Sequence, residues 1–299
     1  MYPTQPYFNK EQKEKTIVHT FPPQHQSQMP GHEHEMNPLP IADNPSYKAS
    51  GKLKNKIAII TGGDSGIGRA VAITFAKEGA KVAIVYFNEK EDAEATKQMI
   101  NAYGGQCLLI EKDLREETSA EEAVKETLAQ YGAPHILVNN CAVQYPQKSI
   151  LQITKEQLYK TFETNFFSYF FMAKAVLPHM TAGASIINTA SITAYKGNKT
   201  LIDYSSTKGA IVSFTRSLSL ALAEEDIRVN AVAPGPIWTP LIPASFDADK
   251  VSQFGNNTPM KRAGQPFELA PAYVYLASDD SRFMSGQVLH INGGDIVNG

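Results

Sequence analysis

The stretch that decides the fold is Thr61-Gly62-Gly63-Asp64-Ser65-Gly66-Ile67-Gly68. It follows the apolar run Ile57-Ala58-Ile59-Ile60 and opens an amphipathic run that continues to Gly79. A strand, a glycine-rich turn and a helix present backbone N–H groups to an anion, and glycines let a pyrophosphate approach the main chain. The spacing is G-x-x-x-G-x-G rather than the G-x-G-x-x-G of the dinucleotide fingerprint. We expect a nucleotide-binding turn here; the alternative is a purely structural connection between strand and helix.

From Lys56 onward, apolar runs rich in Val and Ile alternate with helical patterns. The apolar runs fall at 56–61, 81–86, 106–111, 135–139, 185–189, 228–233 and 287–291. The helical patterns fall near 67–79, 90–103, 119–131, 154–178, 204–224 and 266–277, and Thr154 with Gln157 predicts a capping box opening the fourth. Continuous apolar strands alternating with helices predict an α/β fold. We expect a single Rossmann-like doubly wound domain, with a parallel sheet of roughly seven strands and helices on both faces.

Residues 1–50 differ from the rest, because they are rich in Pro, Gln and His and show no apolar period. Such a segment is expected to bury little surface, which predicts an extended or disordered N-terminal arm before a catalytic domain over 51–299. Several histidines and glutamates of the arm are expected to belong to a solvated polar tail rather than to a metal site. These residues are His25, His32, His34, Glu33 and Glu35.

A long irregular stretch at about 238–265 is expected to be a lid or binding loop. Trp238, Phe246 and Phe254 lie within it. They indicate a partly apolar substrate pocket, although core packing would explain them equally well.

Composition excludes several classes of function. The chain has 28 Lys and Arg residues against 30 Asp and Glu, a net charge of -2, and nothing in this balance indicates nucleic acid or an anionic membrane as a partner. No run of about 18 apolar residues predicts a spanning helix, and the N-terminus lacks the pattern of a secretory signal. Cys107 and Cys141 form no metal or redox pattern, so reduced thiols in the cytoplasm are expected.

Parallel sheets bind ligands at the carboxyl ends of their strands. Ser191 follows the fifth apolar run, and Tyr204 and Lys208 lie four residues apart in a long helical pattern. Residues at this spacing share one face of a helix, so the phenol and the ammonium point the same way. These three side chains are therefore candidates for a catalytic group.

The Tyr-x-x-x-Lys spacing also occurs at Tyr86/Lys90 and Tyr195/Lys199. The first pair is rejected because Tyr86 closes a strand and Lys90 lies beyond the turn. The second contains Gly197-Asn198, which is typical of a loop.

With these motifs in this order, the chain resembles the short-chain dehydrogenase/reductase family of NAD(P)-dependent oxidoreductases over about residues 53–299. The arm resembles that of a bacterial subgroup with extended N-termini, some of them associated with general stress. The resemblance implies a catalytic tetrad of Asn165, Ser191, Tyr204 and Lys208. It implies cofactor contacts from Gly62, Asp64, Ser65, Gly66, Ile67, Gly68, Phe87, Asn88, Asp113, Leu114, Asn139, Ala142, Tyr204, Lys208, Pro234, Gly235, Ile237 and Thr239.

Individual motifs carry separate implications. By resemblance, Asp113 contacts the adenine, and Pro234-Gly235 with Thr239 borders the nicotinamide. Asn139-Asn140-Cys141-Ala142 stands where the family has Asn-Asn-Ala-Gly, so the approach to the cofactor at Ala142 is slightly more crowded. Cys141 is expected to be a small buried apolar residue rather than a redox group.

The resemblance implies hydride transfer between a nicotinamide and an alcohol or carbonyl substrate, with Tyr204 as general acid/base. A free tyrosine has a pKa near 10. A cation about 4 Å away, at an effective dielectric near 20, contributes roughly 4 kcal/mol, so we expect Lys208 to lower the pKa of Tyr204. Ser191 is expected to hydrogen-bond the substrate oxygen. The family further implies that Lys208 holds the nicotinamide ribose and that Asn165 supports a water chain.

The cofactor's ribose is read after the second strand, at Phe87-Asn88-Glu89-Lys90. An Asp there binds the hydroxyls of NAD and an Arg binds the phosphate of NADP, but neither is present. Asp64 and Glu89, expected to be exposed, would repel a 2′-phosphate, and Lys90 would partly offset them. Alternatively, Glu89 only stabilises a helix N-terminus. NAD is favoured and NADP remains open.

The leading prediction is an enzyme acting on a small alcohol, aldehyde or ketone, and its closest alternative is an NADPH-dependent aldehyde reductase. Alternatives of another class are a non-catalytic dinucleotide-binding redox sensor and a structural stress protein. The helical pattern at 154–178 carries more aromatic surface than one sheet face covers. Because members of the family commonly form homotetramers, this surface predicts a homotetramer of 222 symmetry. Its aromatic residues are Phe162, Phe166, Phe167, Phe170 and Phe171.

Overall fold

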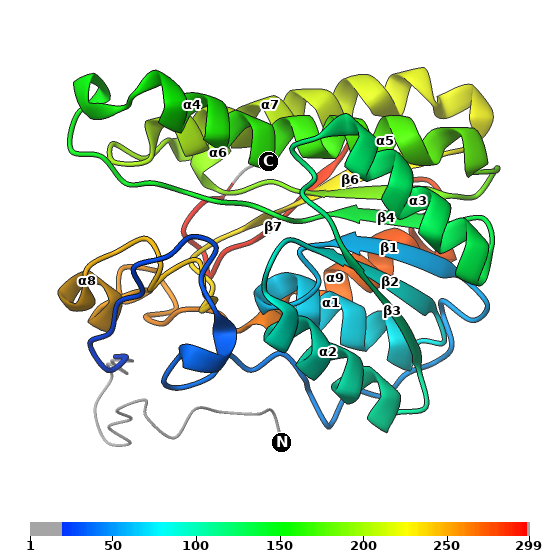
Figure 1. Cartoon of the computed structure of the whole chain (residues 1–299), viewed down its shortest axis with the longest axis horizontal. Helices are drawn as coiled ribbons and strands as arrows, with labels where there is room; N and C mark the ends of the chain where they lie inside the picture. Colours follow the sequence, from blue (N-terminus) through cyan, green and yellow to red (C-terminus); the bar gives the residue numbers. More distant parts are fainter. Residues whose placement is uncertain (1–19, 298–299) are drawn as a thin grey trace.

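The structure, a computed structural model, describes residues 20–297, in which seven parallel strands form one sheet of order β3-β2-β1-β4-β5-β6-β7 (Figure 1). The strands are Ile57–Thr61 (β1), Lys81–Tyr86 (β2), Gln106–Glu111 (β3), Ile136–Asn139 (β4), Ser185–Thr189 (β5), Arg228–Pro234 (β6) and Val288–Ile291 (β7). Six of them lie within the predicted apolar runs, and β6 extends one residue beyond the run predicted at 228–233. The Rossmann-like doubly wound α/β fold is confirmed.

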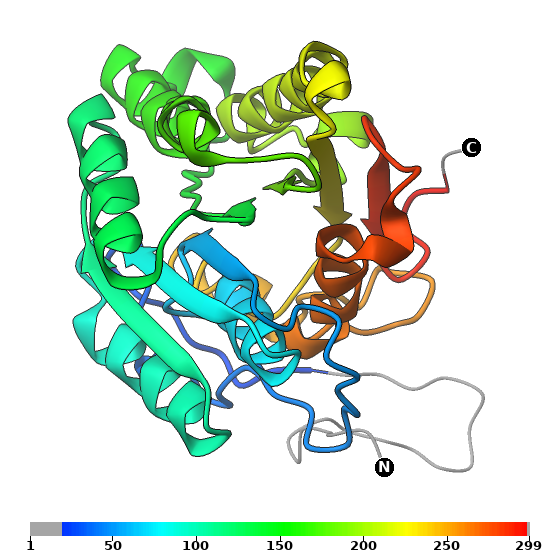
Figure 2. The same ribbon diagram turned by 90° about the vertical axis from the view of Figure 1, so that its right-hand side faces the viewer.

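Helices cover both faces of this sheet (Figure 2). The principal ones are Gly66–Lys77 (α1), Lys90–Ala102 (α2), Glu117–Tyr131 (α3), Lys155–Phe162 (α4), Ser168–Val176 (α5), Ile202–Ala221 (α7) and Ala270–Ala277 (α9). α1 packs against α2 and α9 on one face, and α3, α4, α5 and α7 cover the other (Figure 1). Ala58 and Ile60 join the core cluster beneath α1 and α9, whereas Ile59 joins the one beneath α3 and α5. Because successive strand residues point to opposite faces, a strand buried on both sides is continuously apolar.

The predicted helix at 154–178 is divided by a π-helical turn at Glu163–Phe167. Thr154 caps its start as predicted, since its Oγ1 accepts a hydrogen bond from the Gln157 backbone N–H at 3.1 Å. The reciprocal half of the capping box is not formed. The Gln157 side chain donates instead to the Tyr145 carbonyl (3.1 Å) and to Asp203 Oδ2 (2.9 Å). The start of α4 is thereby tied to α7, a tertiary contact that overrides the local motif.

Residues 20–50, called the arm from here on, contain no strand and have one short 3₁₀ turn at Glu33–Glu35, with bends at 27–30 and 37–38 and a turn at 45–46. The expectation that this segment buries little surface is wrong for its described part. Phe21, Glu33 and Met36 are only 3%, 1% and 4% exposed. The Phe21 ring stacks on Trp238 with centroids 3.8 Å apart. The arm is held by single, separated anchor side chains. For this reason its sequence shows no apolar periodicity that would predict its packing.

Residues 238–265, called the substrate loop from here on, are largely irregular as predicted, with one short helix at Ala248–Ser252 (α8). A bridge between Ile237 and Gly264 closes the base of the loop. In Figure 1 the arm runs beside α8, and the backbone hydrogen bond from Phe21 N–H to the Ser252 carbonyl (3.1 Å) joins the two segments.

Candidate active site

A cavity of about 560 Å³ opens at the carboxyl edge of the sheet. The strand order reverses between β1 and β4 at this edge, which is where doubly wound folds bind ligands. The cavity wall is formed by the glycine turn, the segments after β2 to β6, the start of the substrate loop and residues 29–31 of the arm. Its volume is typical of ligand and cofactor sites.

The glycine turn needs glycine for identifiable reasons. Gly62 and Gly66 have φ angles of +62° and +53°, in the left-handed region that other residues avoid. A Cβ on Gly68 would lie 1.9 Å from the Gly62 carbonyl oxygen, so the helix crosses the turn too closely for any side chain. Five residues of the turn line the cavity while Gly68 does not: Gly62, Asp64, Ser65, Gly66 and Ile67. The N-terminus of α1 thus faces the cavity, a cradle that fits the pyrophosphate of a dinucleotide.

Ser191, Tyr204 and Lys208 all line this cavity. The Tyr204 phenol and the Ser191 hydroxyl are neighbours in it. Lys208 donates from Nζ to the Thr189 carbonyl at 2.8 Å, and its Nζ lies 5.5 Å from the centroid of the Tyr204 ring. The end of β5 and one face of α7 therefore bring together a hydroxyl, a phenol and an amine.

Burial controls the proton affinities of this group. It raises the pKa of Tyr204 to about 12, against a hydrogen bond with Ser191 that lowers it. It lowers the pKa of Lys208 to about 7. The expected depression of the Tyr204 pKa by Lys208 is therefore not found. Lys208 is only 1% exposed, so it loses hydration itself and is only partly charged at neutral pH.

The two rejected Tyr-x-x-x-Lys pairs lie where their context predicted. Tyr86 is the last residue of β2, and Lys90 is the first of α2. Tyr195 lies on the four-residue helix Thr193–Lys196 (α6), which ends before Lys199, and its ring packs against His290 with centroids 4.5 Å apart.

Asn165 is fully buried in the π turn and does not line the cavity. Its Oδ1 accepts a hydrogen bond from Val143 N–H at 2.8 Å, and its Nδ2 donates to the Val143 carbonyl at 2.9 Å. Nδ2 also lies 3.2 Å from Thr207 Oγ1. Asn165 thus holds the segment after β4 against α7, and π turns of this kind recur at functional sites. Its role in a water chain stays a prediction.

Asp113, Leu114 and Phe87 line the end of the cavity next to β2 and β3. Arg115, which the sequence reasoning missed, joins them there. Its Nε lies 2.9 and 3.0 Å from the two carboxylate oxygens of Asp113. Burial raises the pKa of Asp113, but the hydrogen bonds from Arg115 outweigh it and leave that pKa below its usual value. The Arg115 guanidinium also lies 5.8 Å from the Phe87 ring centroid. A cation therefore lies close to the expected adenosine position.

Asp64 and Glu89 both line the cavity, but each is only 5% exposed. The expectation that these acids are exposed is wrong. Burial raises the pKa of Asp64 to about 7, and the neighbouring charge of Glu89 raises it further. Burial also raises the pKa of Glu89. Lys90, expected to offset them, is exposed and does not line the cavity.

The arm contributes Glu33 to the same cluster. Glu33 Oε2 accepts a hydrogen bond from the Gly66 N–H at 2.6 Å, and its Oε1 pairs with Arg69. Its own N–H donates to Asp92 Oδ2 at 2.6 Å. Burial raises the pKa of Glu33 to about 7, although Arg69 and Gly66 both lower it. The glycine turn is thus bonded directly to the arm, a contact that no motif in the sequence indicated.

Two expected cofactor residues besides Gly68 lie away from the cavity. Asn139 donates from Nδ2 to Asn188 Oδ1 at 3.0 Å and so joins β4 to β5. Its neighbour Asn140 lines the cavity instead, and donates from Nδ2 to the Gly62 carbonyl at 3.1 Å. Asn88 is exposed. Five other expected residues do line the cavity: Ala142, Pro234, Gly235, Ile237 and Thr239.

The substrate loop supplies an apolar part of the wall. Phe246 and Phe254 line the cavity, whereas Trp238 is fully buried in the core and donates from Nε1 to the Pro38 carbonyl at 2.9 Å. Both sequence-based readings of these aromatics therefore hold, each for different residues. Gln144 and the arm's Met29–Gly31 turn also line the cavity, and no sequence signal had indicated them.

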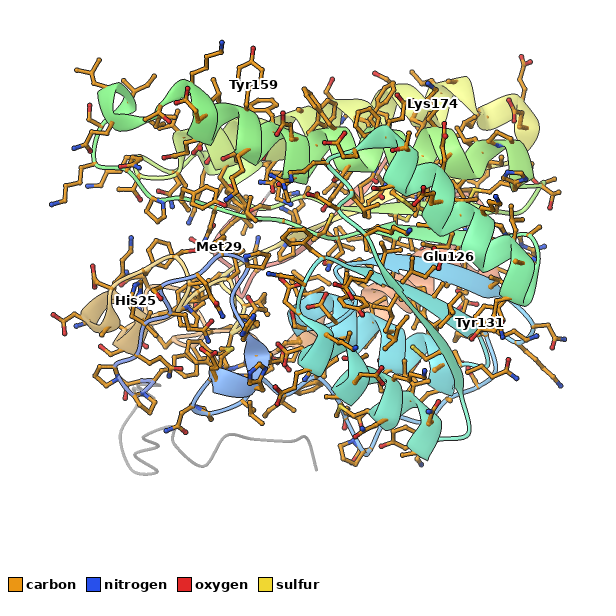
Figure 3. All side chains as sticks on the ribbon, viewed as in Figure 1. His25, Met29, Glu126, Tyr131, Tyr159 and Lys174 are labelled. Carbon is orange, nitrogen blue, oxygen red and sulfur yellow. The ribbon has the colours of Figure 1, made fainter. Side chains whose placement is uncertain are left out.

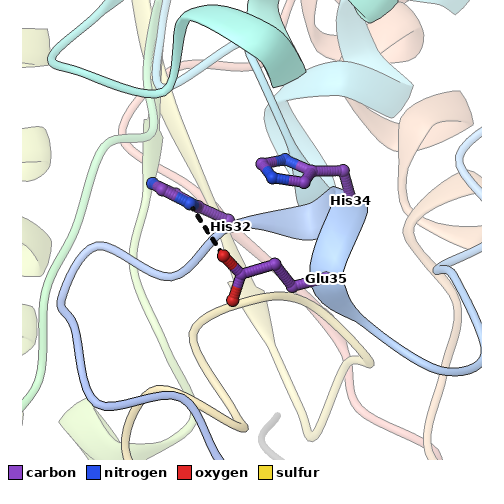
Figure 4. A group of neighbouring side chains, drawn as sticks. All are labelled: His32, His34 and Glu35. Carbon is purple, nitrogen blue, oxygen red and sulfur yellow. Dashed lines mark hydrogen bonds and ion pairs between the residues drawn. The ribbon is translucent and has the colours of Figure 1, made fainter.

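His32, His34 and Glu35 gather on the arm, with one potential ligand atom each within 4.8 Å of the others (Figure 4). His32 Nδ1 lies 2.7 Å from Gln28 Nε2 and 3.3 Å from Glu35 Oε1. His34 Nδ1 lies 3.1 Å from Asp92 Oδ1, and the two imidazole rings stack. Contacts within the protein thus account for this cluster, and the absence of a metal site stays a prediction.

Cys107 and Cys141 are both free thiols. Burial raises the pKa of Cys107 to about 12 and also raises that of Cys141. Thiols of this kind are unreactive, which supports the interpretation of Cys141 as a packing residue.

A family model described as enoyl-(acyl carrier protein) reductase matches residues 62–295. The crystal structure of a short chain dehydrogenase from Burkholderia cenocepacia J2315 in complex with NADP superposes with a TM-score of 0.77 at 27% identity, covering 82% of this chain and 99% of that one. The chain belongs to the short-chain dehydrogenase/reductase family. The 3-ketoacyl-(acyl-carrier-protein) reductase from Brucella melitensis, complexed with NADH, superposes with a TM-score of 0.74 at 31% identity, covering 81% of this chain and 99% of that one. A nicotinamide dinucleotide cofactor is thereby supported.

Curated relatives align over most of the chain. An uncharacterized oxidoreductase, YhxC of Bacillus subtilis (strain 168), is 61% identical over 96% of this chain and 99% of its own length. The glucose and ribitol dehydrogenase of Daucus carota is 52% identical, covering 93% of this chain and 98% of the relative. The chloroplastic NADPH-dependent aldehyde reductase 1 of Arabidopsis thaliana is 51% identical, covering 92% of this chain and 98% of the relative. In the region that the structure describes, no helix combines the length and apolar character needed to cross a membrane.

Proposed function

We propose that this protein is an NAD(P)-dependent oxidoreductase that interconverts a small alcohol and its carbonyl compound, with Tyr204 as the general acid/base. The observation that carries the proposal is the meeting of Ser191, Tyr204 and Lys208 in one cavity with the glycine turn. A protein that only binds a dinucleotide, such as a redox sensor, has no need of this proton-transfer group. The same set argues against a purely structural stress protein.

A bound nicotinamide dinucleotide supplies the hydride acceptor for oxidation and the hydride donor for reduction. The chain's own residues handle the proton. Ser191 donates a hydrogen bond to the substrate oxygen and stabilises charge that develops there. Tyr204 accepts the hydroxyl proton during oxidation and returns it during reduction.

Burial, rather than the charge of Lys208, decides the protonation state of Tyr204. Because burial places the pKa of Lys208 near 7 and that of Tyr204 near 12, the resting pair holds the phenol protonated. This form is the proton donor that carbonyl reduction requires. Oxidation is expected to speed up as the pH rises, because it needs Tyr204 as a proton acceptor. The roles of Lys208 at the nicotinamide ribose and of Asn165 in a water chain belong to the same proposal.

The substrate class follows from the cavity wall and from the relatives. Gln144, Lys196 and Asn198 offer polar contacts, and Phe246 and Phe254 offer apolar ones. Sugar alcohols and small aldehydes satisfy both kinds of contact, and the names of the carrot and Arabidopsis relatives agree with these classes.

NAD is the proposed cofactor, because Asp64 and Glu89 lie at the cavity where a 2′-phosphate would have to fit. The specific alternative is an NADPH-dependent aldehyde reductase. One observation favours it. Arg115 lies over the ring of Phe87, and Phe87 directly follows β2, the strand whose end is expected to contact the ribose.

Assembly and setting complete the proposal. Phe167 and Phe170 are 38% and 48% exposed, which supports a homotetramer formed through the face of α4 and α5. A monomeric mass by light scattering at micromolar protein would contradict it.

Membership of the long-armed bacterial subgroup is supported by the alignment with YhxC, which spans 288 residues and so includes most of the arm. A cytoplasmic location stays a prediction from the sequence.

The deciding experiment screens alcohols, sugar alcohols and aldehydes with NAD(H) and NADP(H), in the parent and in Tyr204→Phe. Turnover in the parent that is lost in the variant supports the proposal. Dinucleotide binding with no turnover across the panel would favour the redox sensor.

A further inference from the structure

The arm lies outside residues 62–295, the part that the family model matches, yet it reaches the active-site cavity at its Met29–Gly31 turn. All three residues of this turn line the cavity, alongside Ile242, Phe246 and Phe254 of the substrate loop. Figure 3 labels Met29 toward the middle of the molecule and His25 farther out beside the substrate loop. The arm is therefore part of the cavity wall rather than a tail attached elsewhere.

Hydrogen bonds attach the arm to the substrate loop on one side of this turn. Gln26 N–H donates to the Pro243 carbonyl at 2.9 Å, and His25 Nδ1 lies 2.8 Å from the Phe246 carbonyl oxygen. Phe21 and Met36 belong to one buried cluster with Trp238 and Tyr204. The proposed catalytic tyrosine thus shares its packing with the arm.

Glu33 attaches the arm to the glycine turn on the other side. It is 1% exposed, bonded to the Gly66 N–H and paired with Arg69. Arg69 in turn donates from Nε to the Asp64 carbonyl at 2.9 Å. The arm therefore spans from the substrate loop to the cofactor turn and is bonded to both.

The fit between the two attachments is tight at Gly31. A Cβ there would lie 2.6 Å from the Pro240 carbonyl oxygen and 2.8 Å from Ala244 Cβ. The turn cannot move closer to the substrate loop, and Met29, two residues before Gly31, lines the cavity. A side chain in this position limits the space that a substrate can occupy.

We propose that the Met29–Gly31 turn is a specificity-determining wall of the active site, in which Met29 sets the size of the substrate that fits and Glu33 is the positioning residue that joins this wall to the cofactor turn. The inference rests on the proposed function for its substrate, a small carbonyl compound. The wall formed by Met29 excludes substrates with bulky groups next to the carbonyl. Shortening Met29 opens the wall without disturbing either attachment.

The first test compares Met29→Ala with Met260→Ala, a matched control because Met260 lies in the substrate loop but is 65% exposed and outside the cavity wall. Propanal and cyclohexanecarbaldehyde are the small and bulky substrates. The kcat/KM ratio of bulky to small substrate is expected to rise at least fivefold in Met29→Ala, mainly through KM, and to stay within about twofold in Met260→Ala. An unchanged ratio in a folded Met29→Ala variant would overturn the size limit.

The second test needs no turnover. NADH titration is expected to show at least fivefold weaker binding in Glu33→Gln, which loses the charge facing Arg69, and unchanged binding in Glu35→Gln, whose carboxylate is about half exposed. The chain has one tryptophan, so the emission of Trp238 reports whether the arm stays docked in each variant.

The two tests fail in different ways. If the parent reduces neither aldehyde nor any compound of the wider panel, the proposed function fails, and the titration alone judges the arm. Equal NADH affinity in the parent and Glu33→Gln, with Trp238 emission unchanged, would overturn the positioning role. Weaker binding in Glu35→Gln to the same extent would also overturn it, because the effect would then follow surface charge.

Discussion

The carboxyl edge of the sheet and the arm line the same cavity, but different forces place them. Tyr204 and Lys208 lie on a 20-residue helix packed against the sheet, so backbone hydrogen bonding and a continuous core determine their positions. The arm has no strand and only one short 3₁₀ helix, and a few anchors such as Phe21 and Glu33 hold it. One cavity can therefore combine a wall that is built into the fold with a wall that depends on a few side-chain contacts. Substitutions in the first wall should mainly change catalysis, and substitutions of the anchors of the second wall should mainly change stability.

The largest expected effect tests the sheet edge. Tyr204→Phe is expected to lower kcat by about 10³-fold, because it removes the proton-transfer group and keeps the ring's packing. Dinucleotide affinity should change by less than about twofold. Steady-state kinetics and a fluorescence titration measure the two quantities. Tyr195→Phe is the control, since Tyr195 lies on α6 against His290. This variant should keep at least about a third of the parent rate. Loss of activity in the control alone would mean that the wrong tyrosine has been assigned.

The next effect tests the arm. Phe21→Ala removes a ring stacked on Trp238 and is expected to destabilise the protein by about 3 kcal/mol, a thermal midpoint lower by roughly 5–10 °C. Differential scanning calorimetry measures the shift. Phe283→Ala should leave the midpoint unchanged, because the Phe283 side chain is fully exposed. A parent-like midpoint in Phe21→Ala, together with red-shifted Trp238 emission, would show that the arm opens independently of the domain.

A smaller effect is expected where the two regions meet. Asp64→Asn with Glu89→Gln should shift the kcat/KM ratio toward NADP by about tenfold, since removing two acidic groups that disfavour a 2′-phosphate is worth on the order of 1.4 kcal/mol. Because both acids are buried, the shift should persist at high salt. Glu91→Gln, whose side chain is 75% exposed, is the control and should not alter the ratio. A parent that already prefers NADP would point to Arg115 as the group that reads the ribose.

The smallest effect is a pH dependence of stability that comes from the arm. Burial raises the pKa of Glu33 from 4.5 to about 7, so the folded state holds more protons than the unfolded state between those values. The free energy of unfolding contributed by this group is therefore fully present below pH 4.5 and is lost as the pH rises to about 7. In Glu33→Gln, the decrease of the thermal midpoint across this pH window should be smaller by about a few degrees. Glu35→Gln should follow the parent curve, and a parallel curve for Glu33→Gln would mean that Glu33 is already charged at low pH.

Much of the catalytic edge could be predicted because its signals are local. Continuous apolar runs located all seven strands of the described chain, the polar residue after the fifth run located Ser191, and the family resemblance located Asp113. Helical spacing separated Tyr204/Lys208 from the two pairs of the same pattern that lie at a turn and in a loop. Each inference used residues within a few positions of one another, where backbone geometry dictates which side chains share a face.

The inferences that failed depended on contacts between distant segments. The exposure of Asp64 and Glu89 was misjudged because Glu33, more than 30 residues earlier, packs into the same cluster. The pKa of Tyr204 was misjudged because burial, which acts through all surrounding elements, outweighs one neighbouring charge. Asn139 and Asn140 could not be told apart in sequence, and the register of β4 with β5 decides which of them faces the cavity.

The sequence by itself determined the order of strands and helices, the glycine turn and the candidate catalytic group, since these follow from chain geometry and from residue chemistry at short range. Only the tertiary structure decided that a polar arm without periodicity lines the cavity that holds the candidate catalytic group. The reason is that Phe21, Glu33 and Met36 are stabilised by partners supplied by α1 and the substrate loop, so their burial is a property of the assembled fold and not of the segment that carries them.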